Sequence, residues 1–481
     1  MAAADALAPP SRRFFGYSGV LTALAIGLSA GILPLLASAE LLWAVAAGVC
    51  FLPIVWLGFS NPKQWPLWFC AAAILLPPLP FPLGDSGVHP SVVIAAAGLL
   101  AGMARLTEWR IEWNALNLAL AALTGALAMS LGFAVLYSGF ALAAASAARF
   151  VLLACGVYVY FTSSQGPGIV DARQAERSAR WLFLIAVAAA LFGCIDFVYQ
   201  LPAPAGFGAQ FIWLNSGVYR RAQGLFYDAS ALGNFCAFFL IMSVVALVHR
   251  ERGKKILPTA VAGAGVVLFL MTLLLSFSRA PLLAAGIGCV ALAVLEKDRW
   301  ARSRWTSPRV LLALAALALV AVAGFAVALP EFAQGYWARA GVDWNSLFTS
   351  PDRVLSGRLE SWQTIGGFIQ EHPWQTVAGI GYKTLPYSQH FGNPVIADNM
   401  YLSSLVETGV FGLCSLLAVN AAILMVCRRA AKRGSFFGKW MFCFWAGEMF
   451  QMFAGDILTF WRVLPVYFWV LAQAALAAGE S

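Results

Sequence analysis

The feature that most constrains this chain is a series of apolar segments of roughly 17 to 25 residues, the length that a helix needs to cross a hydrocarbon layer about 30 Å thick. Of its 481 residues, 61% are hydrophobic and only 11% are charged, too few to enclose a water-soluble core. We therefore predict an all-α polytopic membrane protein with about 12–14 transmembrane helices. These are expected to begin near Gly16, Leu41, Pro66, Pro90, Ala115, Ala141, Arg180, Leu225, Ile256, Ala280, Arg309, Asn399, Gly438 and Arg462.

The net charge of +9 is distributed as an orientation signal. If the N-terminus is cytoplasmic, most of the 31 Lys and Arg residues fall in the inner loops, as the positive-inside rule requires. Attraction to anionic lipid headgroups reinforces this arrangement. We therefore expect both termini in the cytoplasm and membrane lipids as partners, and the charge needs no nucleic acid to explain it.

Basic residues that topology does not require are more informative. They lie in predicted outer loops or within predicted segments, and they are Arg149, Arg220, Arg221, Arg279, Arg339, Arg353, Arg358, Lys383 and Arg462. An Arg within a membrane span costs at least about 2.5 kcal/mol, so each invites an explanation. Guanidinium groups hold phosphate oxygens in a bidentate manner, which predicts a phosphate-bearing ligand at the outer face. The alternative is ion pairing with Asp196, Glu448 or Asp456.

One long polar insertion interrupts the apolar segments. It divides the chain into residues 1–329, which form scaffold helices and carry Arg clusters, a large outer loop over 330–399 that is partly helical, and the last helices over 400–481. The loop gathers most of the outer groups able to transfer a proton, namely Glu360, Glu371, His372, His390 and Asp398. The nine cysteines all lie outside this loop, and their spacing predicts no disulfide framework, metal site or other cofactor.

Two Arg clusters are expected at one membrane surface. Arg279 lies at a turn between two predicted segments, and Pro281 follows where the first turn of a helix tolerates proline. Its guanidinium is thereby placed beside a helix N-terminus, which itself favours anions. Arg220 and Arg221 precede another predicted segment, after an outer loop rich in Pro and Gly.

Four motifs in this order resemble the O-antigen ligase and O-antigen polymerase superfamily, integral-membrane glycosyltransferases of the GT-C type. The resemblance runs from Arg220 to Leu413, somewhat under half of the chain. Each motif alone is weakly specific, and their order, spacing and membrane setting carry the resemblance. The motifs are Arg-x-x-Gly at 221–224, Ser-Arg at 278–279, Ser-Gly-Arg-Leu-Glu-Ser-Trp at 356–362, and the block over 372–412 that contains Gly-Ile-Gly-Tyr and Asp-Asn-Met-Tyr-Leu.

The resemblance implies transfer of a glycan from an undecaprenyl-diphosphate donor to an acceptor hydroxyl, at the periplasmic face of the bacterial inner membrane. The reaction would invert the anomeric carbon and use neither a nucleotide sugar nor an obligatory metal. The acceptor would be lipid A-core for a ligase, or a second lipid-linked glycan for a polymerase of O-antigen or exopolysaccharide. By the same resemblance Arg221 and Arg279 would bind the diphosphate, with Arg220 and Arg358 as further candidates.

The resemblance also implies a base directly before the helix that closes the outer loop. Ligases typically carry a His-Asn pair there, whereas this chain has Asp398-Asn399. This difference slightly disfavours assignment as a standard ligase. A carboxylate can take a proton from a sugar hydroxyl, so we assign the base to Asp398, with His390 as the alternative. Asp398 could instead be the N-cap of that helix. The remaining loop candidates are Glu360, His372, Lys383 and Asn399.

Two other classes of protein remain in competition with an enzyme. A transporter or flippase for a lipid-linked glycan predicts paired halves with broken helices, and charges near the bilayer midplane. A non-catalytic partner in polysaccharide export predicts that glycan assembly survives loss of Arg279. The unusual residues of this chain gather instead at one face, which favours the enzyme. The Gly379–Tyr382 stretch is expected to form a tight loop and not a phosphate cradle.

Overall fold

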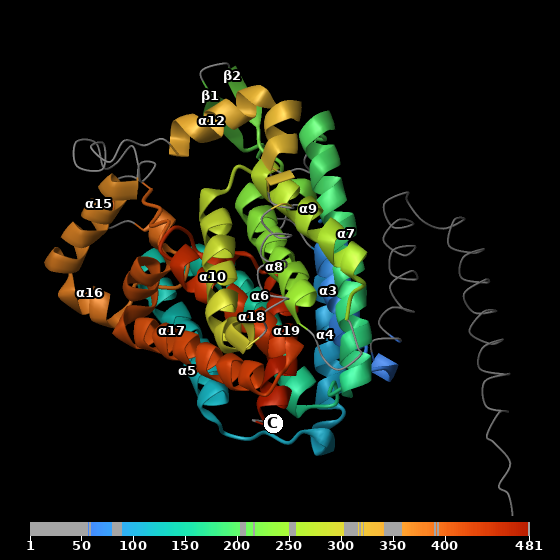
Figure 1. Ribbon diagram of the computed structural model, residues 1–481. Helices are drawn as coiled ribbons and strands as arrows, with labels where there is room; N and C mark the ends of the chain where they lie inside the picture. The colour runs from blue at the N-terminus through green and yellow to red at the C-terminus, as the bar shows by residue number, and fades with distance from the viewer. Residues whose placement is uncertain are drawn as a thin grey trace, which may run out of the picture.

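The computed structural model describes residues 56, 59–78, 89–202, 208–214, 217–249, 256–302, 316, 319–320, 322–340, 358–388, 391 and 394–479. Within these residues the chain is a bundle of helices (Figure 1). Six of them are long and apolar enough to cross a membrane: α5 (Ala115–Ser138), α6 (Phe140–Gln165), α7 (Ala172–Tyr199), α8 (Ala229–Val248), α10 (Arg279–Arg302) and α17 (Met400–Lys432). The prediction of an all-α polytopic membrane protein is confirmed.

Shorter helices complete the bundle. The apolar ones are α3 (Trp65–Leu75), α4 (Ser91–Met103), α9 (Thr259–Leu275) and α19 (Leu464–Ala478), and α18 (Phe436–Gln451) is a further short helix. Short 3-10 turns are η2 (Leu106–Glu108), η3 (Gly224–Phe226), η4 (Leu385–Tyr387) and η5 (Ile457–Thr459). The segments predicted to begin near Gly16, Leu41 and Arg309 begin outside the described residues, and His390 also lies outside them.

Helix α8 is the centre of the bundle. It packs against α9, α10 and α18, and 89% of its apolar stretch is buried, so protein and not lipid surrounds it. A second group of contacts joins α17 to α5, and α6 to both α5 and α19. Aromatic side chains fill the space between α8, α18 and α19: Phe238 lies 4.5 Å from Trp440 and 4.4 Å from Tyr467 between ring centroids. Such tilted aromatic pairs add to the stabilisation that burial of their apolar area provides.

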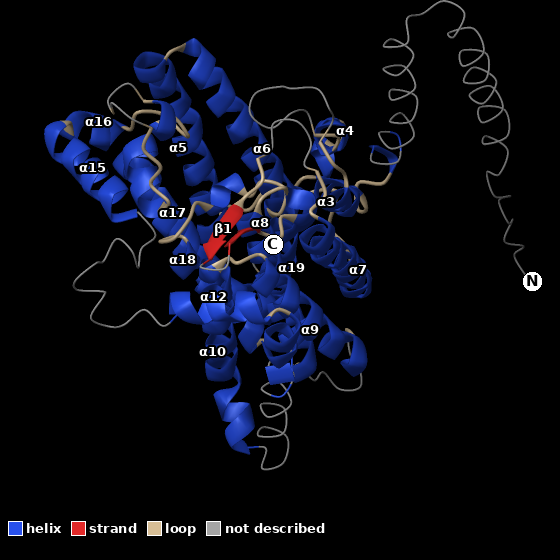
Figure 2. Ribbon diagram, turned by 90° about the horizontal axis from the view of Figure 1, so that it is seen from above, coloured by secondary structure: helices blue, strands red, loops and turns tan. Residues whose placement is uncertain are grey.

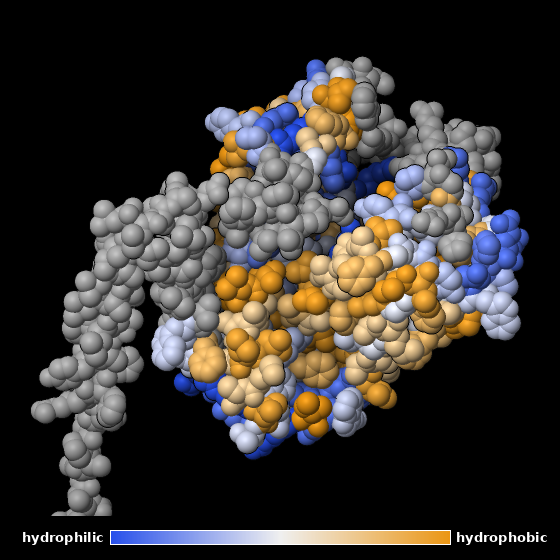
Figure 3. Space-filling view, turned by 180° about the vertical axis from the view of Figure 1, so that it is seen from behind, coloured by the Kyte–Doolittle hydropathy of each residue, from blue (hydrophilic) through white to orange (hydrophobic). Residues whose placement is uncertain are grey.

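The two ends of the bundle differ in charge. The start of α8, the α9–α10 turn, the start of α17, the end of α18 and the start of α19 meet at one end, which we call the cavity end. The opposite end carries basic residues near helix termini, among them Arg173, Arg177, Lys297, Arg429, Lys432 and Lys439. On the face seen in Figure 3, a broad hydrophobic band lies between the two ends.

A small cap covers part of the cavity end. It consists of an antiparallel hairpin, β1 (Phe211–Leu214) and β2 (Gly217–Arg220), and of α12 (Pro330–Ala340), which lies beside the hairpin at the top of Figure 1. Phe332 of α12 packs against Tyr219 of β2, with ring centroids 4.5 Å apart, and against Phe277 of the α9–α10 turn, at 5.4 Å. The cap therefore fixes the hairpin over the turn that carries Arg279.

Two short helices of the outer loop lie at the side of the bundle, α15 (Arg358–Glu371) and α16 (Pro373–Ala378) (Figures 1 and 2). Helix α16 packs against α17 where that helix is broken at Gly409, whose φ is +75°. A Cβ on Gly409 would lie 2.3 Å from the carbonyl oxygen of Val377, so only glycine permits this approach.

The Gly379–Tyr382 stretch runs beside this break as a tight loop. The amides of Ile380 and Gly381 donate to the carbonyl oxygens of Val406 and Glu407, each at 2.9 Å. Because these N–H groups are bonded to α17, the stretch offers them to no phosphate. Its effect is to place its last residue, Tyr382, and the following residue, Lys383, at the cavity end.

Two predicted helix starts were wrong because capping residues, and not hydropathy, decide where a helix begins. The segment predicted near Arg180 starts at Ala172, since the carboxylate of Asp171 accepts from the amide of Gln174 at 2.7 Å and a polar first turn precedes the apolar run. The segment predicted near Leu225 starts at Ala229, which follows the N-cap Asp228.

Candidate active site

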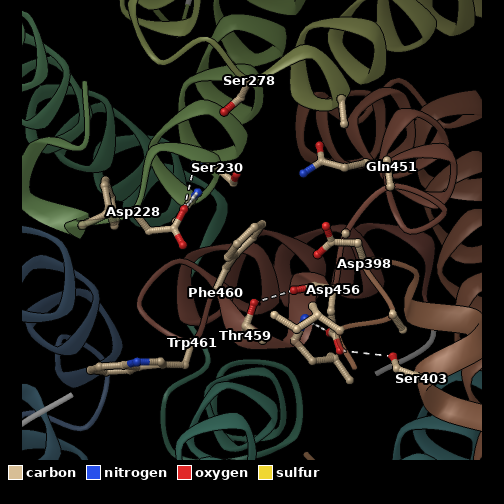
Figure 4. Close-up of a pocket in the computed structure, with 18 of the residues that line it drawn as sticks. Asp228, Ser230, Ser278, Asp398, Ser403, Gln451, Asp456, Thr459, Phe460 and Trp461 are labelled. Atoms are coloured by element: carbon tan, nitrogen blue, oxygen red, sulfur yellow. Dashed lines mark hydrogen bonds between the residues drawn. The ribbon is translucent and has the colours of Figure 1, made fainter. Parts of the chain in front are cut away.

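A cavity of about 930 Å³ opens at the cavity end of the bundle. Its walls come from the start of α8, the α9–α10 turn, β1, the start of α15, the Tyr382–Tyr387 segment and the stretch from Gln451 to Val463. Polar and aromatic side chains of these elements point into the same space (Figure 4). The bundle thus brings residues from distant parts of the chain to one site.

Arg221 and Arg279 share one wall. The guanidinium of Arg221 donates from Nε to the carbonyl oxygen of Ser276 at 2.8 Å and from Nη2 to Ser278 Oγ at 2.7 Å. Arg279 is the first residue of α10, directly after that turn. The turn is tight because Phe277 adopts a left-handed backbone with φ +52°. Both arginines line the cavity, next to the N-terminal amides of α10.

Arg220 is placed differently from its neighbour. Its side chain is buried and forms an ion pair with Asp196, 3.2 Å from Nη2 to Oδ1. The carboxylate of Asp196 also accepts from the backbone amides of Gln223 and Gly224, at 3.1 and 2.9 Å. Arg220 is not among the residues that line the cavity. Its position matches the ion-pairing alternative, and we do not carry it forward as a diphosphate ligand.

Asp398 lies on the opposite wall and is not a helix cap. The N-cap of α17 is Asn399, whose side-chain oxygen accepts from the amides of Tyr401 and Leu402 at 3.0 and 3.2 Å. The capping alternative for Asp398 is therefore wrong. Asp398 adopts a left-handed backbone, with φ +43°, and the next residue, Asn399, occupies the N-cap position. The freed carboxylate reaches Arg358, with 3.3 Å between Oδ2 and Nε.

The segment that carries Asp398 is held from two sides. Trp362 of α15 donates from Nε1 to the carbonyl oxygen of Ala397 at 2.7 Å. The backbone amide of Met400 donates to the carbonyl oxygen of Met452 at 2.8 Å, which joins the start of α17 to the end of α18. The side chain of Asp398 remains about half exposed, at 49%, so a ligand in the cavity can reach it.

A second ion pair lies deeper on the same side. Lys383 Nζ contacts Asp456 Oδ2, and Asp456 Oδ1 accepts from the amide of Leu458 at 3.0 Å as the N-cap of η5. Arg149 of α6 donates to the carbonyl oxygen of Lys383 at 3.2 Å and so ties the loop to the bundle. All three charged side chains line the cavity.

Arg462 and His89 close the inner wall. Arg462 is buried and donates to the carbonyl oxygens of Ala73 at 2.7 Å and Leu76 at 2.8 Å, so its charge meets the C-terminus of α3. Burial lowers the pKa of this guanidinium to about 10, so it stays charged at neutral pH.

His89 Nε2 also donates to Leu76 O, at 2.9 Å, and its Nδ1 accepts from Ser91 Oγ. Burial, and then the charge of Arg462, lower the pKa of His89 to about 3.

The remaining predicted loop residues lie elsewhere. Glu360 is exposed on α15, and His372 sits between α15 and α16 with its ring 5.0 Å from that of Phe368. Neither residue lines the cavity. Lys383 does, and Asn399 acts as the helix cap described above. His390 falls outside the described residues, so its position relative to Asp398 is not part of the structure.

Sequence reasoning missed several lining residues. Asp228 caps α8 by accepting from the amides of Ser230 and Ala231, at 2.6 and 2.9 Å, and an Asp before an apolar run is a recognisable signal of this. Glu407 accepts from the amide of Leu385 at 3.2 Å from inside α17, and an acidic residue within an apolar segment marks it. Gln451 and His89 carry no such signal, because only the tertiary structure brings them to the cavity.

The charges of the cavity suit an anionic ligand bound next to a base. More cations than carboxylates line it: Arg149, Arg221, Arg279, Arg358, Lys383 and Arg462 against Asp228, Asp398, Glu407 and Asp456. Arg221 and Arg279 line the α9–α10 wall, and Asp398 faces the same space with a carboxylate. Among the described residues, no group of three or more His, Cys, Asp or Glu is arranged to hold a metal ion.

Comparison with known proteins adds one finding. Residues 264–417 match the family model described as O-antigen ligase. The matched stretch begins in α9, contains Arg279, Arg358 and Asp398, and ends within α17. No curated protein matches the chain.

Proposed function

Because this chain belongs to the superfamily of O-antigen ligases and O-antigen polymerases, we propose that it is a membrane glycosyltransferase that takes its glycan from an undecaprenyl-diphosphate donor. The acceptor is a sugar hydroxyl, on lipid A-core for a ligase or on a second lipid-linked glycan for a polymerase. The observation that carries the proposal is the shared cavity: Arg221 and Arg279 line one wall, and Asp398 faces the same space from the other.

In the proposed reaction the acceptor oxygen attacks the anomeric carbon of the donor sugar from the face opposite the diphosphate. The new bond joins that oxygen to the anomeric carbon, and the bond from the anomeric carbon to the diphosphate oxygen breaks. Its electron pair leaves with the diphosphate, and the acceptor proton passes to Asp398. The anomeric configuration is inverted, because attack and departure occur on opposite faces.

Arg221 and Arg279 act on the leaving group. Negative charge grows on the diphosphate oxygens as the glycosidic bond breaks, and donors fixed in advance stabilise that charge without having to reorganise. Arg221 is fixed by Ser276 and Ser278, so part of its guanidinium is already anchored. Arg358 orients the carboxylate of Asp398 on the acceptor side.

The charge distribution supports a periplasmic site. The basic helix ends lie opposite the cavity, and the positive-inside rule assigns that basic end to the cytoplasm. The cavity then faces the periplasm of a bacterial inner membrane, where a lipid-linked glycan presents its diphosphate at the membrane surface. The apolar ends of the surrounding helices border the donor's lipid tail.

The test is deletion of the gene in its native host, followed by complementation and gels of lipopolysaccharide and of free polysaccharide. Complete lipid-linked polymer that accumulates without attachment identifies a ligase, whereas accumulation of single repeat units identifies a polymerase. In either case Arg279→Ala and Asp398→Asn should fail to complement, provided that the variant proteins reach the membrane in normal amounts.

Normal glycan assembly by an Arg279→Ala variant would contradict the proposal and favour a non-catalytic assembly partner. A donor that accumulates on the cytoplasmic side of the membrane in the deletion strain would also contradict it, because that result identifies a flippase. The amount of each variant in the membrane fraction, measured on a tagged chain, separates loss of activity from loss of the protein.

A further inference from the structure

Gln451 is a buried polar side chain that the protein itself leaves incompletely bonded. It is the last residue of α18, it is 3% exposed, and it lines the cavity. Within the described part of the chain its carbonyl oxygen Oε1 has no hydrogen-bond partner. A buried amide oxygen without a partner is destabilising, and native proteins keep few of them.

Other polar side chains nearby are bonded to the protein. Ser403 Oγ donates to the carbonyl oxygen of Met400 at 3.2 Å, and Thr459 Oγ1 donates to the carbonyl oxygen of Asp456 at 2.5 Å. Asp456 itself pairs with Lys383. Gln451 therefore differs from these neighbours, because its Oε1 has no hydrogen-bond partner among the described residues.

The position of Gln451 indicates which part of a substrate it meets. The hydrogen bond between the Met400 amide and Met452 ties the end of α18 to the segment that carries Asp398. Figure 4 shows the side chains of Gln451 and Asp398 pointing into the same space, with Ser278 of the arginine wall across from them. A sugar whose anomeric carbon lies between the diphosphate and Asp398 would place its ring substituents beside Gln451.

An amide suits a sugar on chemical grounds. It presents one acceptor and two donor hydrogens in one plane, and a sugar hydroxyl or acetamido group both donates and accepts. It also carries no charge, so it does not compete with the arginines for the diphosphate. A site built to hydrogen-bond a substituent discriminates strongly against a ligand that lacks it.

We infer that Gln451 binds the first sugar of the lipid-linked donor, the one attached to the diphosphate, through a hydroxyl or acetamido group of its ring. The inference rests on the proposed function, since it takes the diphosphate to lie at Arg221 and Arg279. It assigns to Gln451 the recognition of the donor sugar, separate from the charge recognition by the arginines.

The test uses the full chain in lipid nanodiscs and native mass spectrometry with three lipids. These are undecaprenyl diphosphate without a sugar, and the same lipid carrying N-acetylglucosamine or galactose. We expect the wild type to bind at least one sugar-bearing lipid more tightly than the bare lipid. Gln451→Leu should weaken that binding about tenfold and leave binding of the bare lipid unchanged.

Gln473→Leu is the matched control. Gln473 is another buried glutamine with an amide atom that has no partner among the described residues, but it lies on α19 outside the cavity lining. Its substitution should not change the preference for sugar-bearing lipids. If Gln473→Leu reduces that preference as much as Gln451→Leu does, the effect of Gln451 is one of folding, and the inference is wrong.

Failure of the inference can be distinguished from failure of the proposed function. Equal binding of all three lipids by the wild type, or a Gln451→Leu variant that keeps the wild-type preference, overturns the role of Gln451. Arg279→Ala tests the proposed function instead, because it should weaken the binding of all three lipids to the same extent. If Arg279→Ala binds the bare lipid as well as the wild type does, the diphosphate assignment fails, whatever Gln451 does.

Discussion

The carboxylate of Asp398 lies 3.3 Å from the guanidinium of Arg358, measured from Oδ2 to Nε, while the next residue, Asn399, caps helix α17. Two adjacent polar residues thus divide two tasks. Asn399 satisfies the amides at the start of the helix, and Asp398 is left to face the cavity. This division allows the catalytic and structural contributions of the two positions to be measured separately.

Asp398→Asn should abolish most activity and leave the fold intact. General base catalysis typically contributes about 10²- to 10⁴-fold, so the rate of glycan transfer should fall within that range. The melting temperature should change little, because Asp398 is not a cap and its ion pair with Arg358 is partly exposed. Activity of purified protein and thermal unfolding of the same sample give both numbers.

Asn399→Ala is the comparison for that variant. It removes the cap of α17 and should lower the free energy of unfolding by about 1 kcal/mol. Full activity in Asp398→Asn combined with a large loss in His390→Ala would transfer the role of base to His390.

Arg279→Lys should behave almost as poorly as Arg279→Ala. A lysine keeps the charge but loses the planar fork that holds two phosphate oxygens at once. Loss of one such donor costs on the order of 3 kcal/mol, so Arg279→Ala should reduce the turnover rate about a hundredfold or more. Turnover with the lipid-linked donor measures this, and wild-type turnover in Arg279→Lys would show that only the charge matters.

Arg220→Ala should instead reduce stability. It removes one partner of a buried ion pair and leaves Asp196 uncompensated, a change that commonly costs about 3–5 kcal/mol. Thermal unfolding in detergent is the measurement, with Asp398→Asn as the variant expected to unfold near the wild-type temperature. If the Arg220→Ala protein is stable but no longer binds the diphosphate lipid, Arg220 is a diphosphate ligand after all.

Gly409→Ala should prevent the outer loop from docking on α17. A Cβ at this position would meet Val377 O at 2.3 Å, and the backbone conformation, with φ +75°, disfavours any other residue. Gly125→Ala in α5 is the matched control, because no atom lies within 4 Å of the Cβ that it would add. Alanine there should be tolerated and even favour the helix. Limited proteolysis of the loop distinguishes the two, and equal resistance in both variants would contradict the docking.

Stability should fall in mild acid because of His89. In the folded protein the pKa of His89 is about 3, below the value near 6.5 of a histidine in the unfolded chain. Between these two values the unfolded state binds a proton at His89 and the folded state does not, so acid favours unfolding. The stabilisation is complete above pH 6.5 and is lost progressively as the pH falls toward 3. The slope from this group approaches about 1.4 kcal/mol per pH unit.

His89→Gln removes that titration. Glutamine keeps a polar side chain at the position and stays neutral over the whole range. Melting temperatures of both proteins between pH 7 and pH 4.5 should therefore diverge, with the wild type losing more. Parallel curves would show that His89 titrates normally in the folded protein.

The membrane class and the arginine wall could be predicted from the sequence because both depend on local information. Span length and charge asymmetry are properties of the linear chain, and Arg279 was placed by the proline that follows it. The starts of α7 and α8 were misplaced because hydropathy does not record the capping residues Asp171 and Asp228.

The remaining features depend on contacts between distant segments. Arg462 binds carbonyl groups at the end of α3, hundreds of residues earlier, and nothing near Arg462 in the sequence indicates this partner. The crossing of Gly379 and Gly409 is also a tertiary contact: each glycine alone predicts only a turn or a break. Asp398 and Asn399 are equally good caps by residue type, and only the backbone conformation chooses between them.

The most direct test of the account is the release of undecaprenyl diphosphate by the purified chain in lipid vesicles. The vesicles carry the lipid-linked glycan of the native host, and the acceptor is added or withheld. We predict that undecaprenyl diphosphate appears only with acceptor, in step with the new glycoside, and that Arg279→Ala and Asp398→Asn abolish its release. A donor that stays intact while it crosses the vesicle membrane would contradict the account and identify a transporter.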